Sequence, residues 1–77
     1  MKLQAINVEL RGIEKREVED GVIFKFNFED ENGNPFELYT KDEKLIENKQ
    51  KGKKYNLDLD YNFKFKSMKL QKINEVK

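Results

Sequence analysis

The clearest pattern in the chain is the alternation of apolar and polar residues, which is typical of β-strands with one buried face. Between Lys54 and Lys66 every second position is apolar, and polar residues fill the positions between. The apolar positions are Tyr55, Leu57, Leu59, Tyr61, Phe63 and Phe65. The alternation predicts one long strand whose apolar face, Phe63 and Phe65 included, lies in the core. The intervening Asp58, Asp60 and Asn62 are expected to be exposed.

Two further segments alternate in the same way, over residues 22–28 and 36–40. The first segment of the chain is less regular, because its apolar positions change parity and Gly12 lies inside the pattern. A glycine within a strand often marks a bulge or a sharp bend. We therefore expect residues 2–16 to form one long, bent strand. A last strand contains Met68 and Leu70 and then, after a change of parity, Ile73 and Val76.

The segments between these strands contain recognisable turn signals. Glu19-Asp20-Gly21 is typical of a hairpin turn, and residues 30–35 contain the Asn-Gly pair of a longer turn before Pro35. Thr40 and Glu43 have the spacing of a helix capping box. We expect a short helix of roughly two turns after them, held by packing and ended by Gly52.

The predicted order is three strands, a short helix and two strands within one domain, residues 1–77. This is the arrangement of the OB-fold, a partly open five-stranded Greek-key barrel, in which a long bent first strand serves both halves of the sheet. The fold class is therefore all-β with a small helical element. The alternative is an SH3-like barrel, in which the connection after the third strand is usually shorter.

Composition argues against several classes of function. The chain has no cysteine and no histidine, which removes thiolate metal sites, disulfides and the commonest general base. We identify no catalytic constellation, no phosphate-binding loop and no calcium-loop spacing. The sequence therefore predicts a protein that is not an enzyme and uses no metal or cofactor. It contains no signal peptide or membrane-spanning run, which predicts a cytoplasmic protein.

Charge is unevenly distributed, although the formal net charge is only +1. Residues 1–40 carry a balance of −4, and residues 41–77 carry a balance of +5. Clustered lysines on a small barrel are suited to contact a phosphate backbone, and exposed aromatic rings are suited to stack on bases. Tyr39 is the best stacking candidate because its parity opposes that of Phe36 and Leu38, and Tyr61 is the second. The cationic candidates are Arg11, Arg16, Lys25, Lys41, Lys64 and Lys66.

Three segments carry a resemblance of layout. These are residues 35–39, the run from Lys51 to Leu59, and the ending from Ser67 to Ile73. They resemble the last three strands of compact single-stranded-DNA-binding proteins of phages and mobile elements, such as the helix-destabilising proteins of filamentous phages. The resemblance covers about half the chain and includes no diagnostic motif. It implies a protein that binds single strands without sequence preference, often as a homodimer.

The leading hypothesis is a single-stranded nucleic-acid-binding protein that supports replication or transfer of a phage or mobile element. Lys25, Lys41, Lys64 and Lys66 would contact phosphates, and Arg11 and Arg16 would close one end of the groove. The alternative is a small β-barrel adaptor that binds another protein, for which the mixed-sign surface is equally suitable.

Overall fold

The computed structural model describes residues 1–76 as five antiparallel strands and one short helical turn. The elements are β1 (Lys2–Val18), β2 (Gly21–Glu29), β3 (Pro35–Thr40), the 3₁₀ turn η1 (Glu43–Ile46), β4 (Lys54–Asn62) and β5 (Ser67–Glu75). All five strands belong to one sheet of order β3-β2-β1-β4-β5. This order, with η1 between β3 and β4, confirms the predicted all-β, OB-fold-like class.

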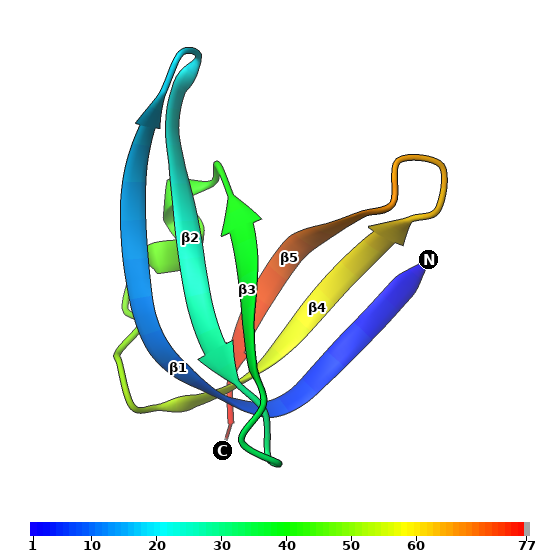
Figure 1. Ribbon diagram of the computed structural model, residues 1–77. Coiled ribbons are helices and arrows are strands. Elements are labelled where there is room, and N and C mark those ends of the chain that lie inside the picture. The colour runs from blue at the N-terminus through cyan, green and yellow to red at the C-terminus, as the bar shows by residue number, and fades with distance from the viewer. Residues whose placement is uncertain (77) are drawn as a thin grey trace.

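The first strand is shared between the two halves of the sheet, as the sequence predicted. The N-terminal part of β1 pairs with β4, and its C-terminal part pairs with β2. The register shifts between Leu10 and Gly12 against β2, and between Ala5 and Val8 against β4. At the second shift Asn7 has a φ of 55°, and its N–H donates to Asn56 Oδ1 at 2.8 Å. Figure 1 shows the result, a long β1 that sweeps from one half of the molecule into the other.

The sheet is bent but not closed, so it is a barrel only in a loose sense. The edge strands β3 and β5 approach each other, yet the ladder order of residues 1–76 does not join them. The core lies inside the bend and is formed by one face of every strand. Its buried residues are Val8, Leu10, Phe24, Phe26, Phe28, Leu38, Tyr55, Leu57, Leu59 and Leu70.

The predicted two-turn helix is wrong, because the structure has a single 3₁₀ turn there. Asp42, and not Thr40, caps it, and the Asp42 carboxylate accepts from the Lys44 N–H at 3.0 Å. The Thr40 hydroxyl instead accepts from the Asp42 N–H at 3.1 Å. Gly52 lies beyond the turn, with a φ of 92° just before β4. A segment with only Leu45 and Ile46 as packing residues buries too little to extend further.

The predicted burial of Phe63 and Phe65 is also wrong. β4 ends at Asn62, so both phenylalanines lie in the turn that precedes β5. Their exposed fractions are 65% and 71%. The other half of the prediction is confirmed, because Leu57 and Leu59 are buried, while Asp58 and Asp60 are partly exposed and Asn62 is exposed.

Candidate functional site

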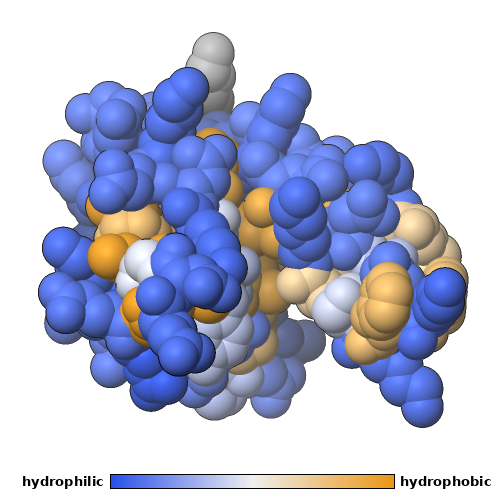
Figure 2. All heavy atoms as spheres, turned by 90° about the horizontal axis from the view of Figure 1, so that it is seen from above, coloured by the Kyte–Doolittle hydropathy of each residue, from blue (hydrophilic) through white to orange (hydrophobic). Residues whose placement is uncertain are grey.

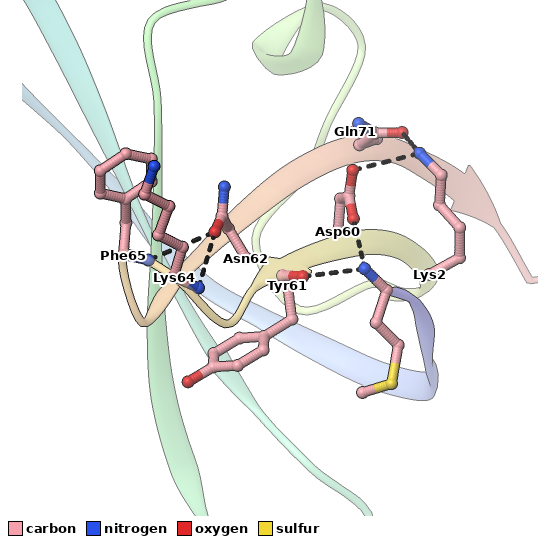
Figure 3. Close-up of polar contacts among 8 residues, drawn as sticks. Lys2, Asp60, Tyr61, Asn62, Lys64, Phe65 and Gln71 are labelled. Carbon is pink, nitrogen blue, oxygen red and sulfur yellow. Dashed lines mark hydrogen bonds and ion pairs between the residues drawn. The ribbon is translucent and has the colours of Figure 1, made fainter.

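The β4–β5 hairpin ends in a turn that is fixed by one side chain. Asn62 Oδ1 accepts hydrogen bonds from the N–H of Lys64 at 3.0 Å and of Phe65 at 3.2 Å. This is the local pattern by which asparagine side chains build turns. Lys66 then adopts a φ of 49°, and the chain returns as β5. Figure 3 shows both bonds converging on the Asn62 oxygen, so the turn holds its side chains in a defined arrangement.

Aromatic and cationic side chains alternate around this turn. We define residues 61–68 as the aromatic tip. The Tyr61 and Phe63 rings meet edge to face at 4.9 Å, and Lys64 Nζ lies 5.5 Å from the centre of the Phe65 ring. Lys64 and Lys66 form no ion pair with any residue that the structure describes. The tip therefore presents exposed rings beside cations that have no carboxylate partner.

The surroundings of the aromatic tip are visible in the space-filling view. Hydrophobic side chains gather at the end of the molecule that corresponds to the β4–β5 turn and the N-terminus in Figure 1 (Figure 2). Besides the two phenylalanines, Met1 is 57% exposed and Met68 is 37% exposed. A gathered apolar patch is more informative than single exposed residues, because such patches mark sites of interaction.

A polar network braces the base of the tip. Lys2 Nζ lies 3.3 Å from Asp60 Oδ2 and donates to Gln71 Oε1 at 3.0 Å (Figure 3). The Met1 amine donates to Asp60 Oδ1 at 3.1 Å and to the Tyr61 carbonyl at 2.9 Å. The hydrogen bond from this amine, followed by that from Lys2, lowers the pKa of Asp60. Three strands thus hold the position from which the tip projects.

The outer face of β2 and β3 contains the second group of candidates and differs from the tip. Lys25 pairs in register with Glu14 on β1 and with Tyr39 on β3. Its Nζ lies 3.1 Å from Glu14 and 3.4 Å from Glu37, and its side chain is only 15% exposed. The hydrogen bond to Glu14 is the main cause that raises the Lys25 pKa. The charge of Lys25 is thus compensated by two carboxylates.

Tyr39 is 42% exposed, which confirms that its parity points it away from the core. Its hydroxyl lies 3.5 Å from Glu37 Oε2, a long hydrogen bond. The ring therefore stands beside carboxylates as well as beside Lys25. A base stacked here would bring its phosphate close to negative charge.

The remaining cationic candidates are dispersed. Arg11, which lies at the bulge of β1, donates to Glu9 at 2.6 Å, and this bond raises the arginine pKa. Arg16 pairs with Ile23 further along the same strand. Lys41 follows β3 and lines a surface depression together with Lys69 and Lys72 of β5. The structure therefore brings Tyr61, Lys64 and Lys66 together and places Arg16, Lys25 and Tyr39 on strands of the other half. Arg11 lines a depression with Glu37, next to this second group, and Lys41 lies apart from both groups.

The sequence analysis missed Phe63 and Phe65 as surface residues of this site. Their parity continues that of Leu57 and Leu59, so alternation alone assigns them to the core. The available signal was Asn62, an asparagine at the start of a stretch that has to reverse direction before Met68.

No protein-family model, curated protein or solved structure matches this chain. Within residues 1–76, no three acidic side chains come together in a way that could hold a metal ion. The same residues include no helix of the length and apolarity needed to cross a membrane. What the site does must therefore be argued from its geometry.

Proposed function

We propose that the protein binds single-stranded nucleic acid through the aromatic tip. The observation that carries this proposal is the pair Phe63 and Phe65, exposed to 65% and 71% in a turn whose lysines have no ion-pair partner among residues 1–76. Every base has a π-face, so exposed rings stack on bases without sequence preference. Adjacent cations attract the phosphates that accompany those bases.

The geometry favours a single strand over a duplex. Bases of a duplex are stacked on one another, so their faces are not accessible to Phe63 or Phe65. A small, projecting hairpin reaches the splayed bases of a flexible strand. The layout resemblance described above favours DNA, and replication or transfer of a phage or mobile element as the biological setting. Both belong to the proposal.

A protein partner is the second candidate, and the same patch favours it. The apolar residues Met1, Phe63, Phe65 and Met68 could bury themselves against another protein. The lysines argue for the first candidate, because the cores of protein interfaces are depleted in lysine.

Fluorescence anisotropy with labelled oligothymidine at low salt tests the proposal. Each stacked base contributes about 1–3 kcal/mol, so replacing both phenylalanines by alanine should weaken binding at least about thirtyfold. Replacing both by tyrosine retains the rings and should retain most of the affinity. Tyr39→Ala is the control for the outer face of β2 and β3, and we expect it to change affinity less than about twofold.

Two results would contradict the proposal. If wild-type protein at high micromolar concentration binds no oligothymidine, the tip serves a different ligand, and a protein partner becomes the better hypothesis. If Tyr39→Ala abolishes binding while the double alanine variant binds normally, the binding surface is the outer face of β2 and β3. Thermal unfolding of each variant verifies that the fold is intact.

A further inference from the structure

Three lysines that have no ion-pair partner among residues 1–76 lie along the opening between the two edge strands. Lys69 and Lys72 on β5 and Lys41 after β3 line one depression, whose other lining residues are Thr40, Asp42, Leu70 and Gln71. None of the three lysines forms an ion pair with a described residue. The Asp42 carboxylate accepts the cap hydrogen bond from the backbone N–H of Lys44 at 3.0 Å. We call this surface the lysine depression; lysines predominate among its charged residues.

The carboxylates opposite these lysines are engaged elsewhere. Lys69 and Lys72 pair in register with Asp60 and Asp58 of β4. Asp60, however, is bonded to the Met1 amine and Lys2. Asp58 accepts from Gln4 at 3.1 Å and from Asn74 at 3.3 Å. The register alone would suggest ion pairs, whereas neither Lys69 nor Lys72 forms one with these carboxylates, and both ammonium groups remain available to an anion.

The lysine depression continues from the aromatic tip along one strand. Lys66 is the last residue of the turn, and Lys69 follows it by three positions on β5. At about 3.3 Å per residue this separation is roughly 10 Å, and Lys72 lies about as far again. Lys69 and Lys72 reach the same depression because the β4–β5 ladder shifts between them. A nucleic-acid strand that leaves the tip along β5 therefore meets these two lysines, and then Lys41 across the opening.

The usual alternative path is unfavourable in this molecule. OB-folds commonly bind oligonucleotides on the face of strands 2 and 3. Here the one lysine in the centre of that face, Lys25, is held by Glu14 and Glu37. Phosphates crossing it would meet carboxylates without a free cation to offset them.

We infer that the phosphate backbone of the bound single strand runs from the aromatic tip along β5 into the lysine depression and does not cross the outer face of β2 and β3. This inference rests on the proposed function and adds its second contact site. Bases are held at the tip by Phe63 and Phe65, and phosphates are held by Lys69, Lys72 and Lys41. A short oligonucleotide engages the tip alone, whereas a longer one engages both.

The test compares two triple variants that remove the same number of charges. The first is K41Q/K69Q/K72Q in the lysine depression. The control is K44Q/K51Q/K53Q, whose lysines are exposed and lie between β3 and β4, on the far side of Figure 1 from the β4–β5 turn. Binding of oligothymidines of about 4 and about 12 nucleotides is measured across a salt series, within the range that one OB-fold accommodates.

We expect the first triple variant to flatten the salt dependence for the longer oligonucleotide. Each phosphate contact on a single strand contributes about −0.7 to the slope of log affinity against log salt, so three lost contacts reduce the slope by about 2. At low salt its affinity should fall at least about tenfold. The control should alter the slope by less than one contact, and neither variant should change binding of the short oligonucleotide by more than about twofold.

The outcomes separate this inference from the proposed function. Equal effects of the two triple variants would mean that binding depends on the net charge of the protein and not on where the lysines lie. That result would overturn the path along β5. A wild-type slope in the first variant, together with a reduced slope in Lys25→Gln, would place the path on the outer face of β2 and β3. In both cases the alanine variant of the tip would still bind weakly, so the proposed function would stand. The proposed function itself is contradicted by absence of wild-type binding to both lengths, or by normal binding of the double alanine variant of the tip when Tyr39→Ala abolishes binding.

Discussion

The aromatic tip and the outer face of β2 and β3 each present an aromatic ring beside a lysine, but the two surfaces are not equivalent. Lys25, beside Tyr39, contacts two glutamates and retains 15% exposure of its side chain. Lys64 lies over the Phe65 ring, 5.5 Å from its centre, in a turn whose residues 63–66 are all exposed. One lysine is part of a surface ion network, and the other remains available to an anion.

Lys25 and Lys64 differ in their ion pairing because Lys25 has a neighbouring strand on each side and Lys64 does not. Lys25 sits on a strand between β1 and β3, so Glu14 and Glu37 reach it from both sides. Residues 63–66 of the aromatic tip lie beyond the paired part of the sheet, and no carboxylate of residues 1–76 forms an ion pair with Lys64. Lysine density along a sequence is therefore a poor guide to an anion site. The cross-strand partners decide whether the charge is available.

The largest expected effect distinguishes the buried part of β4 from its exposed extension. Leu57 is fully buried, so Leu57→Ala should lower the free energy of unfolding by about 2–5 kcal/mol. Phe63 has the same parity but lies in the turn, and Phe63→Ala should change stability by no more than about 0.5 kcal/mol. Urea denaturation of both variants measures the two values.

Comparable losses for the two variants would show that Phe63 packs into the core in solution. The aromatic tip would then lack one of its two phenylalanine rings, and the comparison between the two surfaces would lose its basis. Leu59→Ala is a useful second core variant, since Leu59 is 7% exposed and should show a loss in the same range as Leu57→Ala.

Much of the fold could be predicted because it depends on local alternation. The positions of the apolar residues predict strands with one buried face. Together with Gly12 they also predict the bulge in β1 and a first strand that is shared between the two halves of the sheet. The predicted length of the short helix was wrong because a capping signal does not supply packing. From η1, only Leu45 and Ile46 pack against the core. The predicted end of β4 was wrong because the alternation continues to Phe65, whereas the hydrogen bonds of Asn62 form a turn that ends the strand.

The candidate site was predicted less well, because availability is a tertiary property. Parity placed Tyr39 at the surface correctly, yet parity alone does not show which cross-strand side chains contact Lys25, and the two glutamates beside it were not foreseen. Lys69 and Lys72 belong to a lysine cluster that is visible in the sequence, but only the contacts show that their register partners bond to residues from the N-terminal part of the chain and from β5.

An intermediate effect is expected when the outer face of β2 and β3 is made to resemble the tip. The double variant E14Q/E37Q removes both carboxylates from Lys25 and leaves their shape nearly unchanged. Lys25 then becomes available beside Tyr39, and the salt slope for a longer oligothymidine should steepen by about 0.7, with affinity rising a few-fold at low salt.

The matched control is E17Q/E19Q, which changes the net charge equally; neither carboxylate forms an ion pair within the described chain. It should leave the slope unchanged. Identical behaviour of the two double variants would show that the gain is an effect of overall charge. The ion pairs of Lys25 with Glu14 and Glu37 would then not explain why nucleic acid avoids the outer face of β2 and β3.

The smallest effect is the loss of stability in acid that comes from Glu14, on the side of the molecule that carries Lys25. The hydrogen bond from Lys25, followed by that from Asn27, lowers the pKa of Glu14 below its ordinary value of 4.5. A carboxyl group whose folded pKa is lowered stabilises the fold above its unfolded pKa, and this contribution is lost as the pH falls through the folded pKa. The Glu14 contribution is thus complete at neutral pH and declines below about pH 4.5.

Thermal unfolding of wild type and Glu14→Gln at pH 7, 5 and 3 measures this contribution. The variant should melt a few degrees lower at most at pH 7 and pH 5, because exposed ion pairs contribute little. At pH 3 the two proteins should approach the same melting temperature, since protonation removes from wild type the charge that the variant already lacks. A difference that stays constant down to pH 3 would show that Glu14 is not linked to folding through Lys25. Oligothymidine affinity at the aromatic tip should stay unchanged between pH 7 and pH 5, because Lys64 and Lys66 form no ion pair within residues 1–76 and the lowered pKa of Asp60 keeps the carboxylate at the base of the tip charged.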